Sequence, residues 1–151
     1  MMTLNTVMAH HGIVAIVDDD PEIRQALGAW LALYDLQAAS YPSAESFYAT
    51  LQIDGDHLAI RCQASQPARR PLLGAVLDLK LPGQSGMDLA HTLRGLAPEL
   101  PLVIITALQE EEISHYGTPP PGLRCLRKPF DLDLLEGALE PLFHPVAAGT
   151  V

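Results

Sequence analysis

The sequence predicts an α/β fold in which a parallel β-sheet is covered by helices on both faces. Its apolar residues occur in continuous runs rather than in alternation, which is typical of strands buried on both faces. Helical periodicity fills the intervals between these runs. The resulting order, β-α-β-α-β-α-β-(α)-β-α, indicates a doubly wound sheet. A length of 151 residues with 48% apolar content suits one globular domain.

Four apolar runs are expected to form strands, and the order places a further strand between the first two helices. Each of the four runs leads directly into polar side chains, and this shared feature indicates a common site. The runs and the residues that follow them are 13–17 before Asp18, Asp19 and Asp20, 72–77 before Asp78, 102–105 before Thr106, and 123–127 before Lys128.

Apolar residues at helical spacing separate the expected strands. Asp20, which precedes Pro21, and Asp131 are suited to cap the first and the last of these helices. The four apolar stripes are Ile23, Leu27, Trp30, Leu31 and Tyr34; Ala44, Phe47, Tyr48 and Leu51; Leu89, Leu93 and Leu96; and Leu135, Ala138, Leu139, Leu142 and Phe143.

Some segments depart from this regular plan. Residues 53–71 exceed the usual length of a helix-to-strand connection and are expected to be an insertion with a short element of its own. Residues 109–122 contain three consecutive prolines, so the fourth helix is expected to be short or broken. We expect residues 1–12 to be a disordered lead-in and residues 144–151 to be a tail or the start of a linker.

The composition argues against several classes of function. Nine basic against eighteen acidic residues give a formal charge of −9 without a basic stripe, so direct binding of nucleic acid is not expected. No apolar run approaches the ~20 residues of a membrane span, and the start of the chain lacks a secretion signal. We therefore expect a cytoplasmic protein outside the membrane. Cys62 and Cys125 have no metal-ligand spacing and are expected to be reduced.

The polar groups at the strand ends are expected to meet in one site. In an open parallel sheet the ligand crevice lies outside the carboxyl ends of the strands. Asp18, Asp19 and Asp78 would lie there together, and packed carboxylates need a cation among them. Mg²⁺ is the natural choice of a hard ion that seeks oxygen ligands. The alternative is an acidic strand end that is simply solvated.

Asp78 is the candidate for covalent chemistry, because a carboxylate can attack phosphorus and form an aspartyl phosphate. Such a transfer depends mainly on charge neutralisation and positioning. Lys128 would supply a positive charge, and Thr106 would supply a hydroxyl donor for the phosphoryl oxygens. Ala107 is small and would leave room for the group.

Four motifs resemble those of the receiver domains of bacterial two-component response regulators. They are VDDD at 17–20, LDLKLPGQSG at 77–86, IITA at 104–107 and KPF at 128–130. The resemblance covers residues 13–143 and implies a (βα)5 flavodoxin-like sheet with the strand order 2-1-3-4-5.

The resemblance also implies a role for each matching residue at the metal site. Asp78 would be the phosphoacceptor. Asp19, supported by Asp18, would hold Mg²⁺ together with Asp78 and the backbone carbonyl of Lys80. The interval from Asp19 to Asp78 is longer than is usual in the family, and this is where the insertion falls.

The phosphoryl group and the partners are assigned in the same way. Thr106 and Lys128 would contact the phosphoryl group, with Pro129, often a cis peptide in the family, aiming the lysine. The donor would be a phosphohistidine on a sensor histidine kinase or a histidine phosphotransfer protein, so the chain would not be a turnover enzyme. A second copy or an output partner would bind the face made by the fourth helix, the fifth strand and the fifth helix.

Cys125 departs from the family pattern. Receivers usually carry an aromatic residue three positions before the lysine, which swings inward when the threonine moves. A thiol offers no comparable rotor, and the short fourth helix belongs to the same output face. One alternative is therefore a receiver-like interaction module whose phosphorylation is vestigial or whose switching is atypical. A small aspartyl-phosphate hydrolase is a further alternative, opposed by Lys80 where such enzymes usually place a second Asp.

Overall fold

The computed structural model describes residues 12–62 and 69–143 of the chain. Almost all of the expected lead-in, the tail at 144–151 and the middle of the expected insertion lie outside the described residues.

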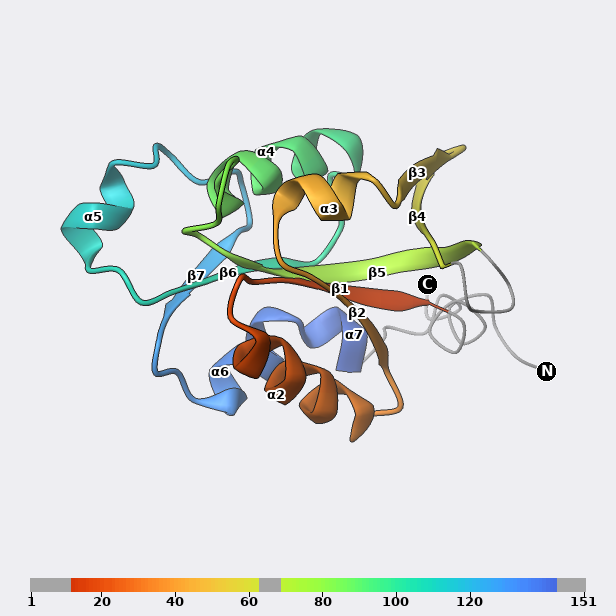
Figure 1. Cartoon of the computed structure of the whole chain (residues 1–151), viewed down its shortest axis with the longest axis horizontal. Coiled ribbons are helices and arrows are strands. Elements are labelled where there is room, and N and C mark those ends of the chain that lie inside the picture. The colour runs from red at the N-terminus through yellow and green to blue at the C-terminus, as the bar shows by residue number, and fades with distance from the viewer. Residues whose placement is uncertain (1–11, 63–68, 144–151) are drawn as a thin grey trace, which may run out of the picture.

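Five parallel strands form the centre of the sheet (Figure 1). Their order is β2-β1-β5-β6-β7, which is the predicted order 2-1-3-4-5 when the parallel strands are counted alone. The predicted flavodoxin-like α/β fold is therefore confirmed. The strands are β1 (Ile13–Val17), β2 (Gln37–Tyr41), β5 (Arg69–Asp78), β6 (Leu102–Thr106) and β7 (Arg124–Arg127).

Helices cover both faces of this sheet. In Figure 1, α2, α6 and α7 lie on one face, while α3 and α4 lie on the other. Two clusters of buried apolar residues match these two layers, one under each set of helices. No helix within the described ranges is long and apolar enough to cross a membrane. The helices are α2 (Pro21–Ala32), α3 (Ala44–Tyr48), α4 (Gly86–Leu96), α5 (Glu110–Ser114), α6 (Leu132–Ala138) and α7 (Glu140–Phe143).

Both predicted N-caps are confirmed. The Asp20 carboxylate accepts the backbone N–H of Glu22 at 2.9 Å, and Pro21 takes the first helical position of α2. The Asp131 carboxylate accepts the N–H of Asp133 at 3.1 Å at the start of α6. Each cap satisfies one of the backbone donors that a helix start leaves without a partner.

An antiparallel hairpin lies within the region expected to be an insertion. It consists of β3 (Leu51–Asp54) and β4 (His57–Arg61). β4 pairs with the first three residues of β5, whereas the later residues of β5 pair in parallel with β1 and β6. Leu58 and Ile60 are buried in the same core cluster as the side chains of α3 and α4. The hairpin is therefore an integral part of the core.

Two helices differ from their predicted extents. α3 ends at Tyr48, because the backbone N–H and the hydroxyl of Thr50 both donate to the carbonyl of Phe47, at 3.0 and 2.8 Å. Leu51, expected on this helix, lies in β3 instead. The last helix is divided into α6 and α7, because Pro141 has no N–H and cannot occupy a helix interior.

The fourth helix of the predicted plan corresponds to α5. It contains five residues, none of them buried, and it lies to one side of the main body in Figure 1. The prediction of a short fourth helix is therefore confirmed. Most residues of strand β7 are also exposed to solvent, and Cys125 is one of them.

Candidate functional site

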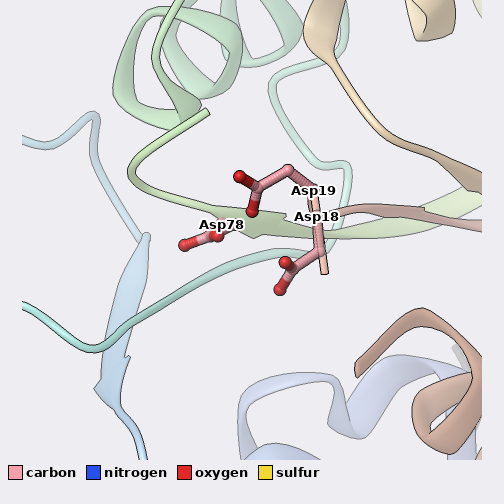
Figure 2. A group of neighbouring side chains, drawn as sticks. All are labelled: Asp18, Asp19 and Asp78. Atoms are coloured by element: carbon pink, nitrogen blue, oxygen red, sulfur yellow. The ribbon is translucent and has the colours of Figure 1, made fainter. Parts of the chain in front are cut away.

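Three carboxylates meet at the carboxyl ends of β1 and β5 (Figure 2). Val17 pairs with Leu77 in the parallel register, so the next residues of both strands lie side by side. Ligand oxygens of Asp18, Asp19 and Asp78 all lie within 4.8 Å of one another. Asp18 is fully buried and Asp78 is nearly so, whereas Asp19 is exposed. The structure thus brings together the three carboxylates named from the sequence.

Both carboxylate oxygens and the backbone carbonyl of Asp18 make polar contacts that fix its position. Its Oδ1 accepts the backbone N–H of Asp20 at 2.9 Å, and its Oδ2 faces the ammonium of Lys128 at 3.2 Å. Its backbone carbonyl accepts a bond from Arg24 Nη1 at 2.6 Å. Arg24 could not be identified from the sequence, where it is one basic residue on an amphipathic helix.

The ammonium of Lys128 lies between two of the carboxylates. Nζ is 3.2 Å from Oδ2 of Asp18 and 3.8 Å from Oδ2 of Asp78. The backbone N–H of Lys128 donates to the carbonyl of Thr106 at 2.6 Å, which continues the pairing of β6 with β7 to the edge of the site. The peptide bond between Lys128 and Pro129 is cis, as the resemblance implied.

The cluster contains more negative than positive charge. The ammonium of Lys128 pairs with Asp18 and Asp78, whereas three carboxylates share the site, and removal from water disfavours the charged form of a carboxyl. Burial, followed by the charge of Asp18, raises the pKa of Asp78 to about 7, although the positive charge of Lys128 opposes this rise. Asp19 contributes to it to a smaller extent. A bound divalent cation would relieve this repulsion.

A cleft of about 450 Å³ opens beside Asp78. The hydroxyl oxygen of Thr106 accepts the backbone N–H of Leu108 at 3.0 Å, which leaves the hydroxyl hydrogen available as a donor. Asp18 is buried behind the cleft. Six of the seven residues predicted to form the site line it, namely Asp19, Asp78, Lys80, Thr106, Ala107 and Lys128.

The residues present fit a hard divalent cation such as Mg²⁺. Carboxylate oxygens are the ligands that this ion prefers, and those of Asp18, Asp19 and Asp78 converge within the span of one coordination sphere. Lys80, whose backbone carbonyl the resemblance assigns to the same ion, lines the cleft beside them. The individual roles of these residues stay predictions.

Comparisons with known proteins find that the chain is similar to response regulators. No protein-family model matches it. It is 28% identical over 138 residues to the probable transcriptional regulatory protein TcrX of Mycobacterium tuberculosis, covering 91% of this chain and 52% of TcrX. It is 29% identical over 122 residues to the C4-dicarboxylate transport transcriptional regulatory protein DctD of Pseudomonas aeruginosa, covering 81% of this chain and 23% of DctD. The chain thus spans about half or less of the length of these curated relatives.

The fold is similar to that of solved receiver domains. The response regulator receiver protein from Sinorhizobium medicae matches with a TM-score of 0.64 and 19% identity, covering 89% of this chain and 95% of that one. The beryllofluoride-activated receiver domain of DrrB matches with a TM-score of 0.62 and 19% identity, covering 87% of this chain and 96% of that one. The fold is that of a response-regulator receiver domain, and the resemblance drawn from the four motifs is confirmed.

Proposed function

We propose that the chain is the phosphoacceptor receiver domain of a two-component phosphorelay, with Asp78 as the acceptor. The observation that carries this proposal is the convergence of Asp78 and Lys128 at the rim of one cleft, with Nζ and Oδ2 only 3.8 Å apart although Asp78 ends β5 and Lys128 follows β7. The sequence relatives, named as transcriptional regulatory proteins, and the receiver-domain fold support the same class.

The transfer itself would require little covalent chemistry from the protein. An oxygen of the Asp78 carboxylate would attack phosphorus, and the P–N bond of the phosphohistidine donor would break. The electron pair would stay on the imidazole nitrogen, which takes a proton from water. Lys128 and the hydroxyl of Thr106 would stabilise the charge on the phosphoryl oxygens. Mg²⁺, held by the three carboxylates, would supply charge neutralisation at the same place. Because Asp78 is itself the acceptor, the chain would not act as a turnover enzyme.

Phosphorylation would signal through charge. A phosphoryl group adds about −1.5 to −2 charges, and it would arrive beside Thr106 and Lys128. Thr106 is the last residue of β6, and Lys128 follows β7 directly. A movement of these two residues would therefore change the surface around β7, α5 and α6. An output partner or a second copy of the chain would bind there. The donor would be a sensor histidine kinase or a histidine phosphotransfer protein.

A second candidate function is a receiver-like interaction module that works without phosphorylation. The observation that favours it is the state of this output surface. No residue of α5 is buried, and Cys125 is exposed on β7 where receivers usually carry an aromatic switch residue. The intact group of Asp78, Thr106 and Lys128 favours the phosphoacceptor.

Treatment with a small phosphodonor and Mg²⁺, followed by intact mass measurement, separates these candidates. We expect the wild type to gain the mass of one phosphoryl group and Asp78→Asn to gain none. Asp88→Asn removes an exposed carboxylate from the neighbouring helix α4 and should behave as the wild type. EDTA should abolish the gain in mass of the wild type and of Asp88→Asn. An unchanged mass of the wild type would support the interaction module instead.

A further inference from the structure

The loop that follows Asp78 accepts a contact from α3, where the carboxylate of Glu45 binds a backbone N–H of the loop. This loop, residues 79–85, joins β5 to α4 and carries Lys80 and the rim of the cleft. Glu45 lies in the first turn of α3, and its Oε1 accepts the backbone N–H of Gln84 at 3.1 Å. α3 thereby contacts the backbone of the loop directly.

The same carboxylate also fits closely against Gly83. This glycine has φ +75°, a conformation that favours glycine, and a Cβ added to it would lie 2.7 Å from Oε1 of Glu45. The bond from Gln84 lowers the pKa of Glu45, so the side chain is ionised at neutral pH. The contact is therefore a charge-assisted hydrogen bond, and a side chain added at position 83 would have to displace the Glu45 carboxylate.

The base of the loop is fixed independently of Glu45. The N–H of Leu79 donates to the carbonyl of Ile105 at 3.0 Å, and the N–H of Gly86 donates to the carbonyl of Leu79 at 2.9 Å. Within residues 12–62 and 69–143, however, the apex at residues 80–84 makes no hydrogen bond except the one to Glu45. Removing this carboxylate would release the part of the apex around Gln84, whereas the buried side chain of Leu81 and the base of the loop would stay in place.

We propose that Glu45 is a positioning residue for the phosphoacceptor site. From α3 it holds the apex of the loop, and thereby the backbone carbonyl of Lys80, in the arrangement that binds Mg²⁺. This inference rests on the proposed function, because it assigns Glu45 a role at the same metal site. A residue bonded directly to a metal ligand typically changes metal affinity by about 10-fold to 100-fold when it is removed. Glu45 acts on Lys80 through the loop backbone, so we expect an effect at the lower end of this range.

Mg²⁺ titration of the full chain by calorimetry tests the proposal. We expect Glu45→Ala to raise the Mg²⁺ dissociation constant about tenfold. Glu45→Gln keeps an acceptor oxygen without the charge, and it should restore the affinity to within about threefold of the wild type. Glu99→Ala removes the same charge from an exposed loop and should leave the affinity unchanged. If Glu45→Gln lost as much affinity as Glu45→Ala, the effect would be one of charge and the positioning role would be wrong.

A double-mutant cycle provides a second readout. Gly83→Ala should weaken Mg²⁺ binding in the wild type, because the added Cβ displaces the Glu45 carboxylate. Its effect should be smaller in the Glu45→Ala background, where only the cost of the positive φ is left. Equal effects in both backgrounds would refute the coupling between these residues.

Hydrogen exchange without metal separates a failure of this proposal from a failure of the proposed function. In EDTA the amide of Gln84 should exchange faster in Glu45→Ala than in the wild type, while the amide of Gly86 at the base of the loop should be unaffected. A wild type that binds no Mg²⁺ and accepts no phosphoryl group would refute the proposed function. A wild type that does both, with Glu45→Ala indistinguishable from it, would refute only the role of Glu45.

Discussion

Replacing Asp78 by asparagine should stabilise the metal-free protein, although it removes the proposed acceptor. The wild-type carboxylate lies against Asp18 and Asp19, with the ammonium of Lys128 3.8 Å away, and its pKa is raised to about 7. An acid that is harder to ionise in the folded protein than in the unfolded chain opposes folding wherever it is ionised. Asparagine keeps the shape of the side chain and removes that charge.

The magnitude follows from the pKa of Asp78. Each pKa unit corresponds to about 1.4 kcal/mol, so the rise from 3.8 to about 7 sets an upper bound of about 4 kcal/mol. The carboxylate lines an open cleft, where water screens its interactions. We therefore expect Asp78→Asn to raise the free energy of unfolding by about 1 to 2 kcal/mol, which corresponds to roughly 3 to 6 °C in the melting temperature at this size.

The pH dependence has a definite sign. Below about pH 4 the carboxyl of Asp78 is protonated in both the folded and the unfolded state, so it contributes no difference. From there to about pH 7 the unfolded chain releases its proton first, and the wild-type free energy of unfolding falls as the pH rises. The advantage of Asp78→Asn should therefore grow from near zero at pH 4 to its full value at pH 8.

Urea unfolding followed by circular dichroism, in EDTA at pH 4 and at pH 8, measures this advantage. Saturating Mg²⁺ at pH 8 should reverse the order of stability, because the wild type binds the ion more tightly. An Asp78→Asn variant that is no more stable than the wild type at pH 8 in EDTA would show that the three carboxylates do not repel one another as their positions indicate.

Three further substitutions test the surroundings of the site, each by urea unfolding in EDTA. Lys128→Met should lower the free energy of unfolding by about 2 kcal/mol, because the fully buried carboxylate of Asp18 loses its ion pair. Gly86→Ala should cost about 2 kcal/mol or more, since the new Cβ would lie 2.1 Å from the backbone carbonyl oxygen of Asp78. Ile60→Ala should cost about 2 to 5 kcal/mol, because this side chain of β4 is fully buried.

Each of these substitutions has a matched control at a neighbouring exposed or unobstructed position. Gly95→Ala lies in the same helix as Gly86 with nothing within 4 Å of the new Cβ, so it should be neutral or stabilising by up to about 1 kcal/mol. Ile53→Ala alters an exposed side chain of the same hairpin as Ile60 and should change stability by less than about 0.5 kcal/mol. Arg127→Met removes an exposed positive charge next to Lys128 and should also be nearly neutral. A variant of Ile60 that behaved like its exposed neighbour would show that the hairpin does not share the core.

The strands and the position of the site were predictable because they depend on local patterns, whereas the strand order was implied by the resemblance to receiver domains. Continuous apolar runs mark strands covered on both faces, and parallel strands deliver the residues that follow them to one edge. Asp78 and Lys128 could thus be placed together without coordinates. The contacts of Arg24 and Glu45 could not, because a charged residue on a helix looks the same whether it meets a backbone group or water.

The hairpin was predicted only as an insertion with a short element of its own, although the signal for two strands is present in the sequence. Leu51 and Ile53 alternate with polar residues, and Gly55 adopts φ +63° in the turn that follows. Leu51 also continues the helical spacing of the preceding stripe, so one residue fits two patterns. Thr50 decides between the helix and the strand. Its bonds to the backbone carbonyl of Phe47 end the helix two turns after the N-cap Ser43, so Leu51 lies in the strand.

The geometry of β5 explains how the hairpin can precede this strand in the chain without disturbing the site. The hairpin pairs with the first three residues of this strand, at the end opposite Asp78. Leu72 begins the parallel pairing with β1, and Leu73 is then skipped in the register, which forms a bulge near the start of the parallel part of the strand. Gly74 follows at once, and a Cβ there would lie 2.9 Å from the carbonyl oxygen of Pro101, so the strand passes close to its neighbour at this point. From Gly74 onward the pairing with β1 continues in regular register to Leu77, which fixes Asp78 beside Asp18 regardless of what is added before the bulge.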